Sequence, residues 1–302
     1  MENFIAHLGQ YAKVDENVAF STMTTMGVGG IARFVAYPKN ELALLEILQL
    51  AKNQQLPVKI LGKGSNILAS DDAYEGLILR LDRTFTDVFF DGEQCVAQAG
   101  ASLIAISYKA MQSGLSGLEF ACGIPGTLAG AVYMNAGAYH GWIGDLVQEV
   151  QVLIDGKIVW IPGYECCWDY RGSIFQQHPD WLILAVRLKL KYKDAEEIRV
   201  LVDQRRNRRI ESQPLDFPNA GSIFRNPKDH FAWEYIEACQ LRGHRIGGAM
   251  ISHKHANFII NVDHAKASDV KKLIHLVQSE VLKQFDVKLQ TEIEFFNWRD
   301  SL

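Results

Sequence analysis

Apolar residues recur along the chain at two spacings, and each spacing predicts its own kind of element. A 3.6-residue period predicts helices, one of them with Ser102 as a candidate N-cap and Gly114 just beyond its end. The predicted helices cover residues 41–55, 102–112, 194–210, 232–240 and 268–285. Shorter apolar or alternating runs predict a buried strand at 58–61, a half-exposed strand at 186–193 and further strands at 258–261 and 288–296.

Two dipeptides mark tight turns between predicted strands. Asp91-Gly92 and Asp155-Gly156 each separate two apolar runs, and Asp-Gly is typical of a two-residue hairpin. Hairpins interspersed with helices predict an α+β fold and not a doubly wound parallel sheet. After Lys193 the chain becomes mainly helical, so we expect one domain over 1–193 and a smaller one over 194–302.

The composition is that of an ordinary globular protein, with 302 residues, of which 48% are hydrophobic and 22% charged. A net charge of −4 gives no reason to expect nucleic acid as a partner. No apolar run approaches the ~18 residues of a membrane span, and the first residues lack the hydrophobic region of a secretory signal. The 5 cysteines include no CxxC pair, so we expect neither disulfides nor zinc, and a reducing cytoplasmic location.

Two polar clusters are open to more than one interpretation. The arginines within residues 205–209 are typical of a solvated helix end, and contact with a phosphate is the alternative. His253 and His255, with His244 near them, lack the carboxylate or cysteine that would complete a set of metal ligands. We therefore expect no metal.

Three glycine-rich segments favour a nucleotide site. They are TTMGVGG at 24–30, LGKGSN at 61–66 directly after a predicted strand, and 117–139, which contains GIPGTLAGA and NAGAY. Glycines let the backbone approach a ligand, so that several amides can converge on a phosphate. None of the segments matches GxGxxG, so the Rossmann fingerprint is absent. Each segment alone is more typical of an ordinary tight turn than of phosphate binding, and only the three together point to a nucleotide.

The second and third segments resemble the FAD-binding domain of the p-cresol methylhydroxylase type, in which two α/β subdomains hold the flavin diphosphate. Three further segments narrow the resemblance: YRGSIF at 170–175, PNAGSIFRNP at 218–227 and LQTEI at 289–293. They resemble, in the same order, the YRxSxF, AGSxFxNP and LExEV segments of the UDP-N-acetylenolpyruvoylglucosamine reductases. The matches extend from about residue 20 to residue 296, nearly the whole chain.

This resemblance implies an FAD-dependent reductase that uses NADPH to convert UDP-N-acetylglucosamine-enolpyruvate into UDP-N-acetylmuramate, in cytoplasmic peptidoglycan precursor synthesis. It implies that residues 1–193 hold FAD without a covalent link and that residues 194–302 form an α+β substrate-binding domain. The expected partner is the small-molecule UDP-sugar, with no nucleic acid and no membrane. A monomer is slightly favoured over an oligomer.

The catalytic residues that the resemblance implies suit the reduction of an enolpyruvyl ether. Charge accumulates on the substrate carboxylate as hydride adds to the alkene, and the Arg171 guanidinium can chelate that carboxylate. Glu292 is the candidate to hydrogen-bond the second carboxylate oxygen, and Ser222 is the candidate proton donor. Without the resemblance, Arg171 would be a surface arginine, Glu292 a solvated strand residue and Ser222 part of an ordinary turn.

The remaining candidates that the resemblance implies are contacts to the two ligands. Tyr170, Asn226 and His255 are the candidates for the substrate. Tyr133, Tyr139 and Trp142 are more typical of packing than of flavin stacking. The candidates for FAD are Thr25, Gly62, Lys63, Gly64, Ser65, Asn66, Gly123, Ile124, Pro125, Gly126, Thr127, Gly130, Asn135, Ala136 and Gly137.

The chain departs from the family pattern at four positions. Ala129 stands where the family commonly has a second glycine. His140 and Trp142 interrupt the usual GAYGxEI, and Gln290 replaces the first glutamate of LExEV. None of these changes removes a candidate catalytic residue.

Two glutamates near the C-terminus compete for the catalytic role. In a strand over 288–296 the two-residue period places Gln290, Glu292 and Glu294 on one face, and Leu289 and Ile293 on the other. Periodicity therefore leaves both glutamates open. The register against LExEV selects Glu292.

Two other functions share some of these features. A related FAD oxidase of the same flavin fold would share the glycine segments, but it would not need AGSxFxNP beside YRxS. A flavin- or nucleotide-binding module without turnover would not need the three candidate catalytic residues. Consumption of NADPH that depends on the enolpyruvyl sugar nucleotide separates the three functions.

Overall fold

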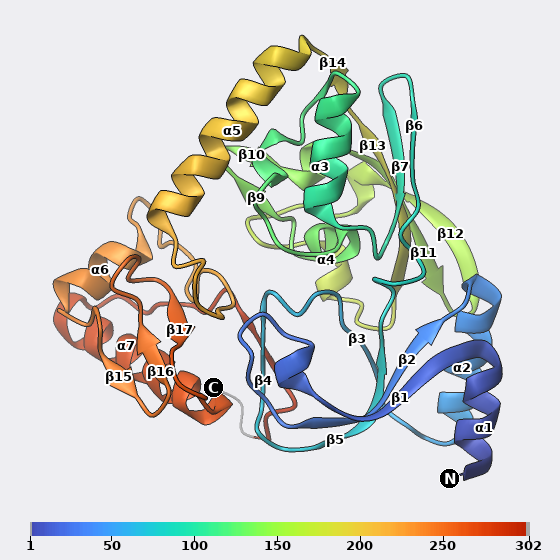
Figure 1. Ribbon diagram of the computed structural model, residues 1–302, viewed down its shortest axis with the longest axis horizontal. Coiled ribbons are helices and arrows are strands. Elements are labelled where there is room, and N and C mark those ends of the chain that lie inside the picture. The colour runs from blue at the N-terminus through green and yellow to red at the C-terminus, as the bar shows by residue number, and fades with distance from the viewer. Residues whose placement is uncertain (1, 300–302) are drawn as a thin grey trace. The chain divides into compact units, whose positions relative to one another are not determined.

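A computed structural model describes residues 2–299 of the chain (Figure 1). The contacts divide the chain into two compact units, and neither unit is a continuous stretch. The first unit comprises Met1–Val14, Ala36–Lys63 and Ile78–Arg209. The second comprises Asp15–Val35, Gly64–Leu77 and Ile210–Leu302. The predicted division at residue 193 into an FAD part and a substrate part concerns function, and it stays a prediction.

An antiparallel sheet of 5 strands, in the order β12-β11-β13-β7-β6, is the main sheet of the first unit (Figure 1). Its hairpins turn where the sequence predicts, because β11 pairs with β12 around Asp155 and Gly156, both at positive φ, and β6 pairs with β7. Strand β13 begins before residue 186, and residues 182–186 are buried on both faces. The bounds are β6 Val88–Asp91, β7 Gln94–Gln98, β11 Val147–Ile154, β12 Lys157–Pro162 and β13 Leu182–Lys189.

Helices of the first unit begin at capping side chains. Asn40 accepts a hydrogen bond from the Ala43 amide at 2.9 Å, and Ser102 accepts from Ala105 at 3.5 Å, as predicted. Helix α5 carries mostly charged residues and buries only Ile198 and Val202, which pack on Cys122. The helices are α1 Glu2–Tyr11, α2 Glu41–Asn53, α3 Leu103–Gln112, α4 Leu128–Tyr133 and α5 Ala195–Ser212.

Short elements join these parts of the first unit. Two-stranded pairs link β8 to β14 and β9 to β10. Their bounds are β8 Leu115–Ser116, β9 Gly137–Ala138, β10 Gly141–Trp142 and β14 Lys191–Tyr192. Single 3₁₀ turns are η2 Glu119–Ala121, η3 Ile143–Asp145, η4 Gly163–Glu165 and η5 Ile174–Gln176.

A sheet of 4 strands, in the order β1-β2-β5-β3, contains three of the points where the chain changes units, and the others lie between Lys63 and Gly64 and within α5 after Arg209. The boundary falls inside β1, β2 and β5. The prediction that residues 58–61 form a buried strand is wrong for β3 itself, because β3 is the edge strand and Ile60 is 37% exposed. The bounds are β1 Ala12–Ala19, β2 Ile31–Pro38, β3 Val58–Ile60 and β5 Tyr74–Leu79.

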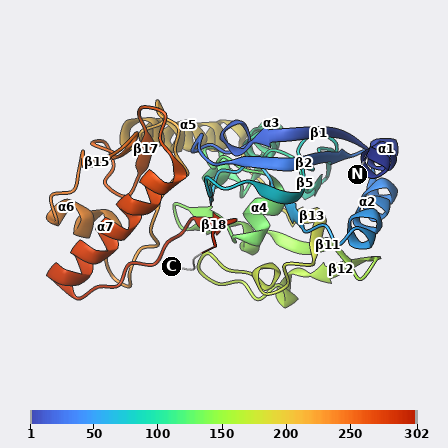
Figure 2. The same cartoon turned by 90° about the horizontal axis from the view of Figure 1, so that it is seen from below.

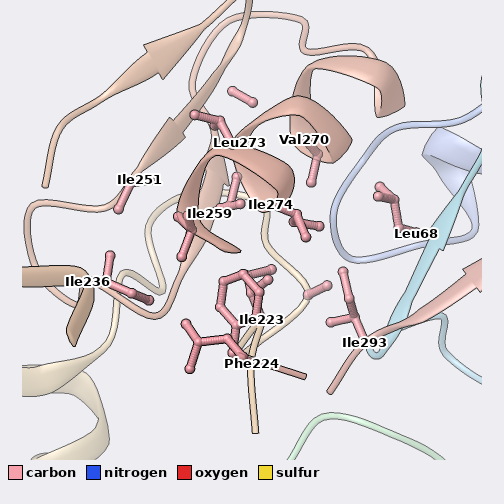
Figure 3. Close-up of a cluster of buried hydrophobic side chains, with 14 of the residues drawn as sticks. Leu68, Ile223, Phe224, Ile236, Ile251, Ile259, Val270, Leu273, Ile274 and Ile293 are labelled. Atoms are coloured by element: carbon pink, nitrogen blue, oxygen red, sulfur yellow. The ribbon is translucent and has the colours of Figure 1, made fainter. Parts of the chain in front are cut away.

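The second unit combines helices α6 and α7 with a sheet in the order β15-β16-β17. Helix α7 packs on this sheet (Figure 2). The core contains Phe224, Ile223 and Leu273, with Leu68 from an N-terminal segment and Ile293 near the C-terminus (Figure 3). The bounds are η1 Phe20–Thr22, β4 Ile67–Ala69, α6 Ala232–Ala238, β15 Arg245–Ile246, β16 Ala249–Ile251, β17 Ile259–Asn261, α7 Ala267–Phe285 and β18 Glu294–Phe296.

The predicted strand over 288–296 is not continuous. Thr291 makes a single bridge with Phe224, and only residues 294–296 form β18, which pairs in parallel with β4. The chain changes pairing partner between these points, which interrupts the ladder. The predicted alternation nevertheless holds at Leu289 and Ile293, which are buried. Within residues 2–299, no helix has the length and apolar character needed to span a membrane.

Candidate functional site

The first two glycine-rich segments meet within the second unit. The Thr25 amide donates a hydrogen bond to the carbonyl oxygen of Gly64 at 3.1 Å. A Cβ at Gly64 would lie 2.5 Å from the carbonyl oxygen of Met23, and its φ is +61°, so only glycine fits there without strain. The Thr25 hydroxyl oxygen is buried and has no hydrogen-bond partner among the described residues. A buried hydroxyl in this state suits a ligand that supplies the missing partner.

In the first unit, the second and third segments also meet. A Cβ on Gly62 would lie 2.7 Å from the Thr127 hydroxyl oxygen. The same hydroxyl accepts a hydrogen bond from the Gly130 amide at 3.3 Å and so caps α4. Thr127 therefore has a structural role whether or not it touches a ligand.

The third segment also packs against α5. The Arg205 guanidinium carbon lies 5.3 Å from the centre of the Tyr139 ring, and the Tyr139 hydroxyl donates to the Arg205 carbonyl oxygen. The Arg209 side chain runs across Gly123, where an added Cβ would lie 2.6 Å from Cδ of Arg209. Arg206 and Arg208 are exposed. The solvated-helix interpretation therefore holds for the exposed pair and is wrong for Arg209.

Arg209 has unusual electrostatics for an arginine. Burial lowers the pKa of its guanidinium from the ordinary value. Among residues 2–299 its side chain makes no ion pair with a carboxylate, and the titratable groups near it are the Tyr139 phenol and the Cys122 thiol. A partly buried cation beside a glycine-rich segment fits an anionic ligand.

Arg171 has a strained backbone and aromatic neighbours. Its φ is +55°, a conformation that costs a non-glycine residue roughly 1 kcal/mol or more. Its guanidinium carbon lies 5.3 Å from the centre of the Trp142 ring and 5.3 Å from that of Tyr170. The Gln176 amide donates to the Arg171 carbonyl oxygen at 3.1 Å. Strain of this kind is often found where function requires it.

Asn135 connects the third glycine segment with the segment around Arg171. Its side-chain nitrogen donates to the Asp169 carbonyl oxygen at 2.9 Å, and its side-chain oxygen accepts from the Gly144 amide at 3.0 Å. The Ser173 hydroxyl donates to the Tyr133 carbonyl oxygen at 2.7 Å. The first unit therefore brings together the third segment, Tyr170 and Arg171, and the buried Asn135 side chain is already used in holding them.

Ser222 and Glu292 belong to two paired segments of the second unit. The Glu292 amide donates to the carbonyl oxygen of Ile223, the residue after Ser222, at 2.7 Å. The Asn66 side chain donates to the Glu292 carbonyl oxygen at 3.2 Å. Ser222 and Glu292 are both half-buried, whereas Glu294 is exposed. Candidates for FAD, proton donation and carboxylate binding thus converge within one unit.

His255 lies close to this group, and Asn257 connects them. The Asn257 amide donates to His255 Nδ1 at 3.2 Å, and the Asn257 carbonyl oxygen accepts from the Ile223 amide at 2.9 Å. Burial, with a smaller effect of nearby Arg242, lowers the pKa of His255 below its ordinary value of 6.5. His255 is therefore neutral at physiological pH, with its proton on Nε2.

Asn226 has a structural contact that the sequence does not reveal. Its side-chain oxygen accepts a hydrogen bond from the Ala232 amide at 3.1 Å, at the start of α6. Asn226 is exposed, as are Lys63, Pro125, Gly130 and Tyr170. The half-buried FAD candidates are Thr25, Gly62, Ser65, Asn66, Gly123, Ile124, Gly126 and Ala136, and the buried ones are Gly64, Thr127, Asn135 and Gly137.

The candidate catalytic residues are divided between the units. Arg171 belongs to the first unit, and Ser222 and Glu292 belong to the second. Sequence reasoning missed Asn257, and it gave contact of Arg209 and its neighbouring arginines with a phosphate only as the alternative. Arg205 and Arg209 are four residues apart and so share one face of a helix, a spacing that could have marked them.

Cysteines and metal ligands add no chemistry to these groups. Burial raises the pKa of Cys166 to about 12, which makes its thiol a poor nucleophile and suits the predicted packing role. All 5 cysteines are free thiols, with Cys167 exposed. Within the described part of the chain, no cluster of His, Cys, Asp and Glu side chains could hold a metal ion.

Two protein families match parts of the chain. The FAD binding domain matches residues 32–162, and the C-terminal domain of UDP-N-acetylenolpyruvoylglucosamine reductase matches residues 213–296. The second match covers the segment that carries Ser222, Asn226, His255 and Glu292.

Whole-length relatives carry the same name. A UDP-N-acetylenolpyruvoylglucosamine reductase of Caldicellulosiruptor bescii is 44% identical over 90% of this chain and 87% of its own. One of Pediococcus pentosaceus is 40% identical over 97% of both chains. The crystal structure of the reductase of Thermus caldophilus superimposes with a TM-score of 0.82 at 33% identity, over 95% of this chain and all of that one. These findings confirm the predicted fold class, an α+β protein with an FAD-binding domain of the p-cresol methylhydroxylase type.

Proposed function

The chain belongs to the family of UDP-N-acetylenolpyruvoylglucosamine reductases, FAD-binding oxidoreductases, and on this premise we propose the complete reaction. The protein uses NADPH to reduce UDP-N-acetylglucosamine-enolpyruvate to UDP-N-acetylmuramate. The observation that carries this proposal is the hydrogen bond from the Glu292 amide to the Ile223 carbonyl oxygen, which pairs the segment of Glu292 with the segment of Ser222 in the second unit. The Glu292 carboxyl group and the Ser222 hydroxyl suit the carboxylate and the carbanion of an enolpyruvyl substrate.

The residues present fit FAD. Thr25 offers a buried hydroxyl without a partner among residues 2–299, and the glycines at 62 and 64 leave no space for a side chain. Arg209 offers a partly buried positive charge beside Gly123. Arg209 beside Gly123, in the first unit, would hold the diphosphate, and each of the other candidates would contact the cofactor. Bound FAD supplies hydride transfer, which no side chain can supply.

Side chains of the protein have three roles in this proposal. Arg171 binds and polarises the substrate carboxylate, because a guanidinium offers two parallel donors to its oxygens. Glu292 hydrogen-bonds the second oxygen as charge develops there. Ser222 gives its hydroxyl proton to the carbanion, which is a base strong enough to accept a proton from an alcohol. Neutral His255, Tyr170 and Asn226 contact the UDP-sugar.

The setting of the reaction is also part of the proposal. We place the enzyme in the cytoplasm, in the synthesis of peptidoglycan precursors, with FAD held without a covalent bond. The proposed enzyme needs neither nucleic acid nor a membrane, and a monomer is slightly favoured over an oligomer.

One assay tests the proposal against its rivals. Purified protein should be yellow, and denaturation should release its FAD into solution. Beyond the single equivalent that reduces the bound flavin, NADPH should be consumed only when UDP-N-acetylglucosamine-enolpyruvate is added. Oxygen-dependent oxidation of an alcohol would indicate the related oxidase, and bound flavin without any turnover would indicate a binding module. Either result would overturn the proposed reaction.

A further inference from the structure

The Arg171 guanidinium is flanked by two aromatic rings that are themselves in contact. Its carbon lies 5.3 Å from the ring centres of both Trp142 and Tyr170. The two ring centres are 5.7 Å apart, with the ring planes at 80°. An arginine in this position is attracted to the ring faces, and its long side chain has little freedom to rotate.

The Trp142 side chain packs against the third glycine segment. Trp142 pairs with Gly137 in the β9–β10 hairpin, and any Cβ at Gly137 would overlap the Trp142 ring. The indole therefore packs directly on the backbone of Gly137. Tyr170, by contrast, is exposed and lies on the same short segment as Arg171. Of the two aromatic neighbours, only Trp142 belongs to a separate part of the fold.

The family pattern GAYGxEI has no tryptophan at the position of Trp142, so these contacts are not part of that pattern. We propose that Trp142 is a positioning residue, which holds the Arg171 guanidinium in the orientation that receives the substrate carboxylate. This inference rests on the proposed function, because it takes Arg171 as the carboxylate-binding group. The Trp142 ring contacts both the Arg171 guanidinium and the backbone of Gly137, and Gly137 is itself a candidate for contact with FAD. Trp142 would thus fix the position of the substrate carboxylate relative to the cofactor.

Four variants and a matched control test this role. Trp142→Leu removes the ring, and Trp142→Phe keeps an aromatic face. Trp160→Leu is the control, because Trp160 also lies over an arginine, Arg187, at 5.0 Å in the same unit, and it plays no part in the proposed site. Arg171→Ala, alone and combined with Trp142→Leu, shows whether Trp142 acts through the arginine.

The measurements are FAD content, melting temperature and the two half-reactions in stopped flow. Trp142→Leu should slow reoxidation of reduced flavin by the enolpyruvyl substrate by roughly 10–100-fold, the scale expected for a misplaced catalytic group. Its FAD content and its flavin reduction by NADPH should match the wild type. Trp142→Phe should recover most of the rate, and Trp160→Leu should show no loss. In the Arg171→Ala background, Trp142→Leu should cause no further loss.

The outcomes separate this inference from the proposed function. If the substrate does not reoxidise the reduced wild-type flavin, the proposed function is wrong and the inference falls with it. If the wild type reacts and Trp142→Leu is equally fast, the inference alone is wrong. The inference is also overturned if Trp142→Leu slows the Arg171→Ala protein further, or if it lowers FAD content as much as the rate, because Trp142 would then act on folding or flavin binding.

Discussion

The Glu292 amide donates a hydrogen bond to the carbonyl oxygen of Ile223 at 2.7 Å, which pairs Glu292 with the residue that follows Ser222. The adjoining bridge between Thr291 and Phe224 and the hydrogen bond from the Arg225 amide to Gln290 fix the same register. Shifting this register by one residue would turn the Glu292 side chain to the opposite face. The relative position of the two groups is therefore set by main-chain pairing and not by the side chains.

Ser222→Ala should separate the two half-reactions. Flavin reduction by NADPH should persist, because the serine proton is needed only after hydride has reached the substrate. Reoxidation by the enolpyruvyl substrate should slow by roughly 10²–10⁴-fold, the usual effect of a positioned proton donor. Stopped-flow absorbance of the flavin measures both steps. Equal loss in both would indicate a defect in folding or FAD binding and would contradict the assigned role.

Two glutamine substitutions test which C-terminal glutamate acts. Glu292→Gln should strongly slow flavin reoxidation by substrate, while FAD binding and reduction by NADPH survive. Glu294→Gln is the matched control and should change the rate little, because Glu294 is exposed in β18. Stopped-flow traces of reduced flavin mixed with substrate compare the two. A slow Glu294→Gln protein would mean that the assignment is wrong by two residues.

Arg209→Ala should weaken FAD binding. Loss of a charge-assisted contact to a phosphate corresponds to roughly a 10–100-fold rise in Kd. Fluorescence titration of the apoprotein with FAD measures this change. Arg206→Ala serves as the control, since Arg206 is exposed on the same helix and should leave Kd unchanged. An unchanged affinity in Arg209→Ala would show that the buried cation does not meet the cofactor.

His140→Gly should stabilise the protein. His140 occupies the β9–β10 turn with φ +61°, where glycine has no strain. Relief of that strain should raise the free energy of unfolding by about 0.5–1 kcal/mol. Urea denaturation followed by circular dichroism detects such a change. His140→Ala keeps the strained backbone and should give no gain, so equal stabilisation by both variants would contradict the explanation.

The lowered pKa of His255 has a consequence for stability against pH. Because its folded-state pKa lies below 6.5, the neutral imidazole contributes stability that is present above about pH 6.5 and lost as the pH falls through the folded-state pKa. Unfolding free energies should therefore fall more between about pH 7.5 and about pH 5 in the wild type than in His255→Asn. His275→Asn, at an exposed position on α7, should fall as the wild type does. Parallel losses in the wild type and His255→Asn would disprove the coupling.

Local signals explain why much of the fold could be predicted. The hydroxyl of Ser102 and the turn at Asp155 and Gly156 act on residues close to them in sequence. The helix start and the hairpin can therefore be predicted without knowledge of the tertiary structure. The exposure of Ile60 was not predictable, because it depends on β3 being an edge strand. The interruption of the 288–296 strand follows from a change of pairing partner, which no local pattern records.

The sequence identified candidate residues for the site, but it did not predict which of them contact each other. Motif resemblance pointed to Ser222 and Glu292, yet neither spacing nor composition predicts that Glu292 pairs with the residue after Ser222. The burial of Arg209 depends on Gly123, which is distant in sequence. Charged side chains on a helix are usually exposed to solvent, so the sequence predicted an exposed Arg209 and not a partly buried one.

The core of the second unit combines residues that are far apart in sequence, and this determines when the core can form during synthesis. Met26, Val28 and Leu68 pack with residues beyond position 220, and β4 finds its partner in β18, whose last residue is Phe296. A ribosome makes the N-terminal residues first, so their apolar side chains lack these packing partners until translation is almost complete. A transcript truncated before residue 294 would yield a chain in which β4 has no partner strand to receive it, and such a fragment would present exposed apolar surface to chaperones and proteases.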